Sequence, residues 1–145
     1  WWGHGEALHV TAFRWSEPEN LGDGNPERCL FGRVKDVRFE NIEVTTEAGT
    51  LVWGQQPGLI DGISFQGISQ LMRKESKWEP RIDLRPNDVL PMVSRPHNAF
   101  ELVNAGSVKF SNVKVSFSGN RSDYGLVINN EASELSGSIV EEPGD

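Results

Sequence analysis

The densest group of chemically capable side chains lies between Lys77 and Arg85. The run SKWEPRIDLRP contains Lys77, Trp78, Arg81, Asp83 and Arg85. A guanidinium binds a carboxylate through two parallel hydrogen bonds, and an indole offers a flat surface on which a sugar ring can stack. These residues therefore predict a site for an acidic saccharide. They equally fit an ion-pair network that pins a long loop through Asp83 and either arginine.

A second candidate is His4, which lies between two glycines in the opening stretch WWGHGEALHV. An imidazole at this place can hydrogen-bond a carboxylate or a hydroxyl near neutral pH. The alternative is a turn residue without a chemical role. Glu6 and His9 follow on the same predicted strand and face either a groove or solvent.

Charge and composition exclude several kinds of site. The net charge is −7 over 145 residues, which disfavours a nucleic-acid partner because phosphate binding relies on Lys and Arg. Cys29 is the single cysteine, so no internal disulfide or thiol-based zinc site is expected. The sequence also has no phosphate-binding Gly-rich loop, no metal-ligand run and no apolar span of membrane length, and we expect no cofactor.

The charge is unevenly distributed along the chain. Between Gln70 and His97 the sequence has six basic and four acidic residues, a local charge of +2, so the remainder carries −9. A locally basic segment in an acidic protein strengthens the prediction of an anionic ligand there.

An internal repeat predicts the scaffold. The stretches VKDVRFENIEV, LIDGISFQGIS, AGSVKFSNVKV and, more faintly, ASELSGSIVEE alternate apolar and polar residues. Aligning them places Phe39 over Phe65 over Phe110, with separations of 26 and 45 residues, and Val108 over Leu135. Asn41, Gly67 and Asn112 then fall at equivalent bends. The shorter stretches GTLVWG, AFELVNA and YGLVINN each precede one of the repeats.

Two short strands per repeat predict an all-β fold, a right-handed parallel β-helix of several coils in one domain spanning residues 1–145. Apolar residues of successive repeats would stack inside it. Two long loop insertions, at about 14–32 and 71–97, are the places where we expect function. The competing architecture is a β-sandwich, whose strands recur without the longer period.

These residues resemble the polygalacturonase-like glycoside hydrolases of family 28, which belong to the β-helical pectinase group. GHGEALHV is similar to the Gly-His-Gly loop of that family, and VKDVRFENIEV is similar to the coil that follows it. TEAGTLVWG occupies the place of the family's Arg-Ile-Lys triplet, and SKWEPRIDLRP resembles a stretch of uncharacterised bacterial relatives. The resemblance in order and spacing covers about the first half of the chain.

The resemblance implies a catalytic role for His4 in hydrolysis of a pectin-type or other acidic polysaccharide. One departure is important, because Leu51, Val52 and Trp53 replace the triplet and remove its cations. Trp53 would then stack on a sugar ring, or be a partly buried aromatic residue. The family's catalytic aspartates lie before the Gly-His-Gly loop, so we expect none here and no turnover by this chain alone.

Three functional hypotheses remain. The first is the C-terminal coils of a polygalacturonase-like hydrolase, secreted or periplasmic by resemblance, with substrate-binding residues Trp53, Lys77, Trp78, Arg81, Asp83 and Arg85. The second is a non-catalytic carbohydrate-binding or structural β-helix module. The third is a trimeric adhesin or tailspike segment. Each has open coil ends, which predict self-association because unpaired strand edges recruit further strands.

Overall fold

The computed structural model describes residues 6–13, 31–84 and 92–144, and these residues form an all-β structure dominated by parallel sheets. A 3-10 turn at Arg121–Asp123 is the single helical element in these ranges. The prediction of an all-β chain with parallel sheets is confirmed for this part of the chain. No helix in it is long and apolar enough to cross a membrane.

The chain visits three parallel sheets in the same order in its first two passes, and its later passes return to the four-stranded and then the five-stranded sheet. The four-stranded sheet has the order β1-β4-β9-β11, and the five-stranded sheet has the order β12-β10-β6-β3 with β13 also paired to β10. A two-stranded sheet joins β2 to β5. Their bounds are β1 Leu8–Ala12, β2 Val34–Lys35, β3 Arg38–Thr46, β4 Thr50–Gly54, β5 Ile60–Asp61, β6 Ile63–Met72, β9 Phe100–Val103, β10 Ser107–Phe117, β11 Ile128–Glu131, β12 Glu134–Ser136 and β13 Ile139–Glu142.

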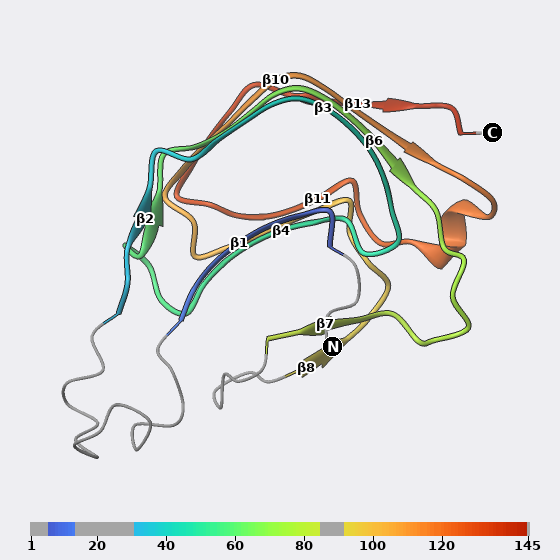
Figure 1. The fold of residues 1–145 in the computed structure, drawn as a ribbon, viewed down its shortest axis with the longest axis horizontal. Coiled ribbons are helices and arrows are strands. Elements are labelled where there is room, and N and C mark those ends of the chain that lie inside the picture. The colour runs from blue at the N-terminus through green and yellow to red at the C-terminus, as the bar shows by residue number, and fades with distance from the viewer. Residues whose placement is uncertain (1–5, 14–30, 85–91, 145) are drawn as a thin grey trace.

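The strands of each sheet lie over one another when viewed along the stacking direction, and the four-stranded sheet faces the five-stranded sheet (Figure 1). The short sheet of β2 and β5 lies at one side between them. Each pass of the chain adds one strand to the four-stranded sheet and at least one strand to the five-stranded sheet, whereas the two-stranded sheet takes β2 and β5 from the first two passes. This repeated return to the same sheets agrees with the repeated sequence pattern.

The predicted register is confirmed residue by residue. Phe39 pairs with Phe65 and Phe65 pairs with Phe110, and their rings stack at centroid distances of 5.2 and 5.3 Å. Val108 pairs with Leu135, also as aligned from the sequence. Burying apolar side chains between layers contributes roughly 1.5–3 kcal/mol each, so this stack is a main source of stability.

The equivalent bends have the left-handed backbone that their residue types predict. Asn41, Gly67 and Asn112 have φ angles of 55°, 63° and 51°. Asn and Gly tolerate this conformation better than other residues. The bend reverses the alternation of side chains, so Phe39 before it and Ile42 after it both contact the core.

Apolar side chains gather on both faces of the four-stranded sheet. The main core fills the space between the four- and five-stranded sheets and includes Phe65, Phe100 and Phe110. A second cluster lies on the outer face, under an antiparallel hairpin of β7 (Arg81–Asp83) and β8 (Met92–Ser94). Figure 1 shows this hairpin on the side of the four-stranded sheet that faces away from the five-stranded sheet.

The second predicted insertion begins later than the sequence indicates. β6 continues through Met72, whose side chain is fully buried, so irregular chain begins at Arg73 rather than Leu71. The insertion also contains regular structure, because β7 and β8 pair within it. Most of the first insertion, residues 14–30, lies outside the described residues.

Candidate functional site

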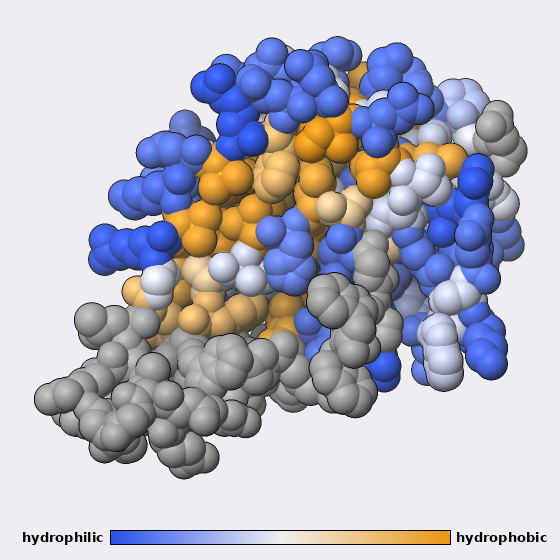
Figure 2. All heavy atoms as spheres, viewed as in Figure 1, coloured by the Kyte–Doolittle hydropathy of each residue, from blue (hydrophilic) through white to orange (hydrophobic). Residues whose placement is uncertain are grey.

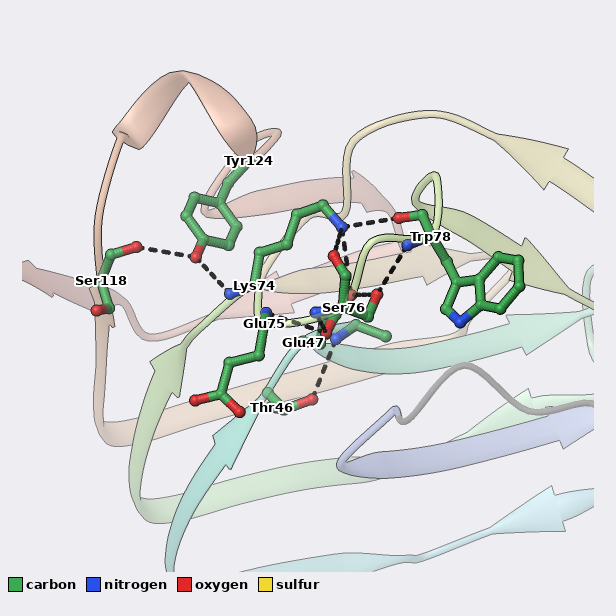
Figure 3. A network of polar contacts seen from close by, with 9 residues as sticks. Thr46, Glu47, Lys74, Glu75, Ser76, Trp78, Ser118 and Tyr124 are labelled. Atoms are coloured by element: carbon green, nitrogen blue, oxygen red, sulfur yellow. Dashed lines mark hydrogen bonds and ion pairs between the residues drawn. The ribbon is translucent and has the colours of Figure 1, made fainter.

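Glu47, in the turn after β3, clamps the segment that carries the predicted Trp78 site. Its carboxylate accepts hydrogen bonds from the backbone N–H of Glu75 at 3.2 Å and of Ser76 at 2.9 Å, and from the Ser76 hydroxyl. Lys74 Nζ lies 3.4 Å from the same carboxylate. Figure 3 shows how these groups converge on Glu47 from a segment nearly thirty residues away.

The groups around Glu47 favour the charged form of its carboxylate. Burial would raise the pKa of Glu47, but the hydrogen bonds from Ser76 and Glu75 and the charge of Lys74 lower that pKa from 4.5 to about 2. The Glu47 carboxylate is therefore fully ionised near neutral pH.

Lys74 and Tyr124 add further hydrogen bonds to the segment that Glu47 holds. Lys74 Nζ donates to the carbonyl oxygens of Ser76 at 2.9 Å and Trp78 at 2.7 Å. The backbone N–H of Lys74 donates to the Tyr124 hydroxyl at 2.8 Å, and that hydroxyl donates to the Ser118 carbonyl (Figure 3). The backbone leading to Trp78 is thus fixed at several points.

Trp78 is the most exposed large apolar residue of the described chain. Its exposed fraction is 65%, although its backbone is held by Ser76 and Lys74. Lys77 Nζ lies 5.3 Å from the centroid of the ring. An exposed indole on a clamped backbone, with an ammonium beside it, is suited to stacking on a sugar and attracting an anionic group.

Trp53 lies in a different environment. It is 7% exposed and packs in the outer cluster with Leu51, Ile82 and Val103. The β7–β8 hairpin covers this cluster, so little of the ring is left for stacking on a sugar. This burial favours the second of the two sequence interpretations, an aromatic packing residue.

Arg81 and Asp83 flank Ile82 on β7. Ile82 is buried in the outer cluster, and alternation on a strand turns its half-buried neighbours Arg81 and Asp83 to the opposite face. Both have polar or ionic interactions, so the ion-pair interpretation and the binding interpretation remain predictions for them. The predicted residues His4 and Arg85 lie outside the described residues.

Sequence reasoning did not anticipate a buried polar cluster on the outer face of the four-stranded sheet. Glu101 on β9 is 3% exposed and accepts hydrogen bonds from Arg95, from Asn98 at 2.5 Å and from Asn129 at 2.8 Å. Asn98 in turn accepts from the Leu126 N–H at 2.7 Å. The only sequence signal is a Glu inside the apolar strand FELV.

Glu6 adds a second buried carboxylate near the start of β1. Its side chain is 8% exposed, and its Oε2 lies 3.9 Å from His9 Nδ1. Burial would raise the pKa of Glu6, but the hydrogen bond from His9 and the charges of His9 and His97 outweigh it and lower that pKa. Glu6 therefore stays ionised near neutral pH, which suits a base or a hydrogen-bond acceptor rather than a general acid.

In residues 6–13, 31–84 and 92–144, no three His, Cys, Asp or Glu side chains gather so that they could hold a metal ion. Comparisons with protein-family models, curated proteins and solved structures find no match to this chain.

Proposed function

We propose that this chain is part of a right-handed parallel β-helix that binds an acidic saccharide, with Trp78 as the stacking platform. The observation that carries the proposal is the 65% exposure of an indole on a backbone clamped by Glu47. A preformed aromatic surface loses little conformational entropy on binding, which favours affinity.

The β-helix itself is supported by the repeated alternation of the chain between the four- and five-stranded parallel sheets and by the aligned Phe39, Phe65 and Phe110. Its right-handedness follows from the general rule that crossover connections between parallel strands are almost always right-handed.

The polygalacturonase-like hydrolase and the binding module share this saccharide site and differ in catalysis. Leu51 and Trp53, which stand in place of the Arg-Ile-Lys triplet, are 1% and 7% exposed and pack under the hairpin. They offer no cation and little surface to a uronate. Binding without turnover is therefore the function that the geometry favours for this chain.

The test is calorimetric titration with oligogalacturonate and with a neutral oligosaccharide of equal length, at low and moderate salt. We expect the acidic sugar to bind more tightly, and salt to weaken it because exposed charges are screened. Trp78→Ala should weaken binding of both sugars about tenfold, equivalent to about 1.4 kcal/mol. Lys77→Gln should weaken only the acidic one.

Two variants serve as controls. Leu126→Ala removes an apolar side chain that is nearly as exposed as Trp78, at 58%, and Lys109→Gln removes an exposed cation on β10. Neither should alter affinity. Unchanged affinity in Trp78→Ala, or no binding of either sugar, would contradict the proposal.

A further inference from the structure

The segment that carries Trp78 is attached to the rest of the structure on both sides of the indole. Before Trp78, Glu47 accepts a hydrogen bond from the backbone N–H of Ser76. After Trp78, the backbone N–H of Arg95 donates to the Pro80 carbonyl oxygen at 3.2 Å. This bond extends the ladder of β7 and β8 by one residue pair, so Arg95 joins the base of the hairpin to the residues that follow Trp78.

Arg95 is in turn held by a buried carboxylate of the four-stranded sheet. Its Nη2 donates to Oε1 of Glu101 on β9. Figure 2 shows hydrophilic residues mainly at the margins of the visible face and apolar residues across its middle, and a buried carboxylate departs from this division. A buried charge is tolerated where it is paired and hydrogen-bonded. Arg95 supplies that pairing, so the two side chains depend on each other.

The other partners of Glu101 are donors as well. Asn98 donates to its carboxylate at 2.5 Å and Asn129 at 2.8 Å. A carboxylate only accepts hydrogen bonds, whereas a glutamine amide of nearly the same size both donates and accepts. Three donors around one side chain therefore require Glu rather than Gln at position 101.

Arg95 carries a cost that stability alone would not favour. Its Nε is buried, and within the described residues no acceptor lies in hydrogen-bond distance of that atom. A buried donor without a partner destabilises the folded state. Positions that break this rule are commonly functional, because selection for stability would remove them. The cost at Nε therefore favours a role for Arg95 in addition to its pairing with Glu101.

Building on the proposed function of Trp78, we propose that Arg95 and Glu101 are positioning residues for the saccharide site. They fix the backbone that follows the indole, as Glu47 fixes the backbone that precedes it. Glu101 holds Arg95 against the sheet, and Arg95 holds Pro80, two residues from Trp78. Both act on the sugar through the orientation of the indole and make no contact with it. An indole held from both sides loses less conformational entropy on binding.

The test compares Arg95→Met with Asn129→Leu. Each variant removes one donor from Glu101, but only Arg95 is bonded to the segment of Trp78. The first readout is the heteronuclear NOE of the Trp78 indole N–H in the chain without sugar. Arg95→Met should lower this NOE, because the indole becomes more mobile, and Asn129→Leu should leave it at the wild-type value.

The second readout is calorimetric affinity for a neutral oligosaccharide, which reports stacking without the effect of removing a charge. Arg95→Met should weaken binding about 2- to 10-fold, because the freed indole must be ordered on binding. Asn129→Leu should not change the affinity. Arg95→Lys should restore most of the NOE and of the affinity, because an ammonium group can still pair with Glu101.

Glu101→Gln provides an independent perturbation, since it places an amide donor among three donors. It should also lower the NOE of Trp78, and urea denaturation should establish that each variant is folded. An indole as rigid in Arg95→Met as in wild type, or equally mobile in Asn129→Leu, would overturn the positioning role. A wild-type chain that binds neither sugar would contradict the proposed function of Trp78, whereas the NOE values decide the positioning role without any sugar.

Discussion

Replacing Glu47 with Gln should loosen the segment that carries Trp78, by an amount that can be worked out from the structure. Lowering the pKa of Glu47 from 4.5 to about 2 corresponds to roughly 3 kcal/mol of preference for the charged form in the folded state, at about 1.4 kcal/mol per unit. The side chain is 25% exposed, so solvent screening reduces this to about 1–2 kcal/mol.

The most direct assay is amide hydrogen exchange at Ser76, whose N–H donates to Glu47 at 2.9 Å. At pH 7, Glu47→Gln should lower protection of this amide about 5- to 30-fold, the factor that corresponds to 1–2 kcal/mol. Glu131→Gln, which makes the same change at an exposed glutamate on β11, should leave the protection of the Ser76 amide unchanged.

The lowered pKa of Glu47 also makes this stabilisation depend on pH. Because the folded-state pKa of Glu47 lies below its ordinary value of 4.5, its stabilisation is complete above about pH 5 and is lost as pH falls towards 2. The difference between wild type and Glu47→Gln should therefore shrink over that interval. Equal Ser76 protection in the two proteins at pH 7, or a difference that does not depend on pH, would refute the clamp.

Three further predictions concern the scaffold. Asp61 accepts hydrogen bonds from the Ser107 N–H, the Ser107 hydroxyl and the Gly62 N–H, which lower its pKa below 3.8. Carbon-detected NMR titration of the Asp61 carboxyl should show this lowered pKa. Ser107→Ala should shift the midpoint of the Asp61 titration upward. Gly137→Ala should release β12 and β13, seen as faster hydrogen exchange, because its Cβ would lie 1.8 Å from the Phe110 carbonyl oxygen. Gly119→Ala, with the same φ of 81° and open space, should not release them. Gln70→Ala should cost about 2–4 kcal/mol in urea denaturation, because it opens a cavity and leaves buried polar partners unpaired. Gln66→Ala, at an exposed position of the same strand, should stay within about 0.5 kcal/mol of wild type.

The sequence predicts the strand register well because that register depends on local alternation and a repeated spacing. Phe39, Phe65 and Phe110 align from their positions alone, and Asn41 and Asn112 mark the bends by their side-chain chemistry. Both signals are visible in the sequence itself, as a pattern that recurs along the chain and as residue types that favour a bend, so they do not require knowledge of tertiary contacts.

The polar interior could not be predicted in this way. Gln70 lies between Val44 and Val115 in a row of inward residues, and it is buried because Thr50 donates to it at 2.7 Å and it donates to the Ala99 carbonyl at 2.8 Å. A glutamine in an alternating strand ordinarily indicates a solvent-facing position. Its partners come from β4 and from the residue just before β9, which no local pattern identifies.

Contacts from distant segments also determine the surroundings of Trp53 and Glu47. The sequence predicts Trp53 as a sugar platform or a partly buried residue. The burial of Trp53 depends on the hairpin of β7 and β8, a distant segment that folds over it. Glu47 had no predicted role, since its partners Glu75 and Ser76 lie nearly thirty residues away. Trp78 is exposed in the structure, and its role as a saccharide platform stays a prediction.

The central claim is that Trp78 is the surface on which a saccharide binds. The most direct test is to follow the indole N–H resonances during titration with oligogalacturonate, with Trp78 assigned from a Trp78→Phe variant. We predict a saturable shift of the Trp78 resonance and none for Trp53, which is 7% exposed against 65% for Trp78. An unshifted Trp78 resonance at saturating sugar, or a shift confined to Trp53, would contradict the account.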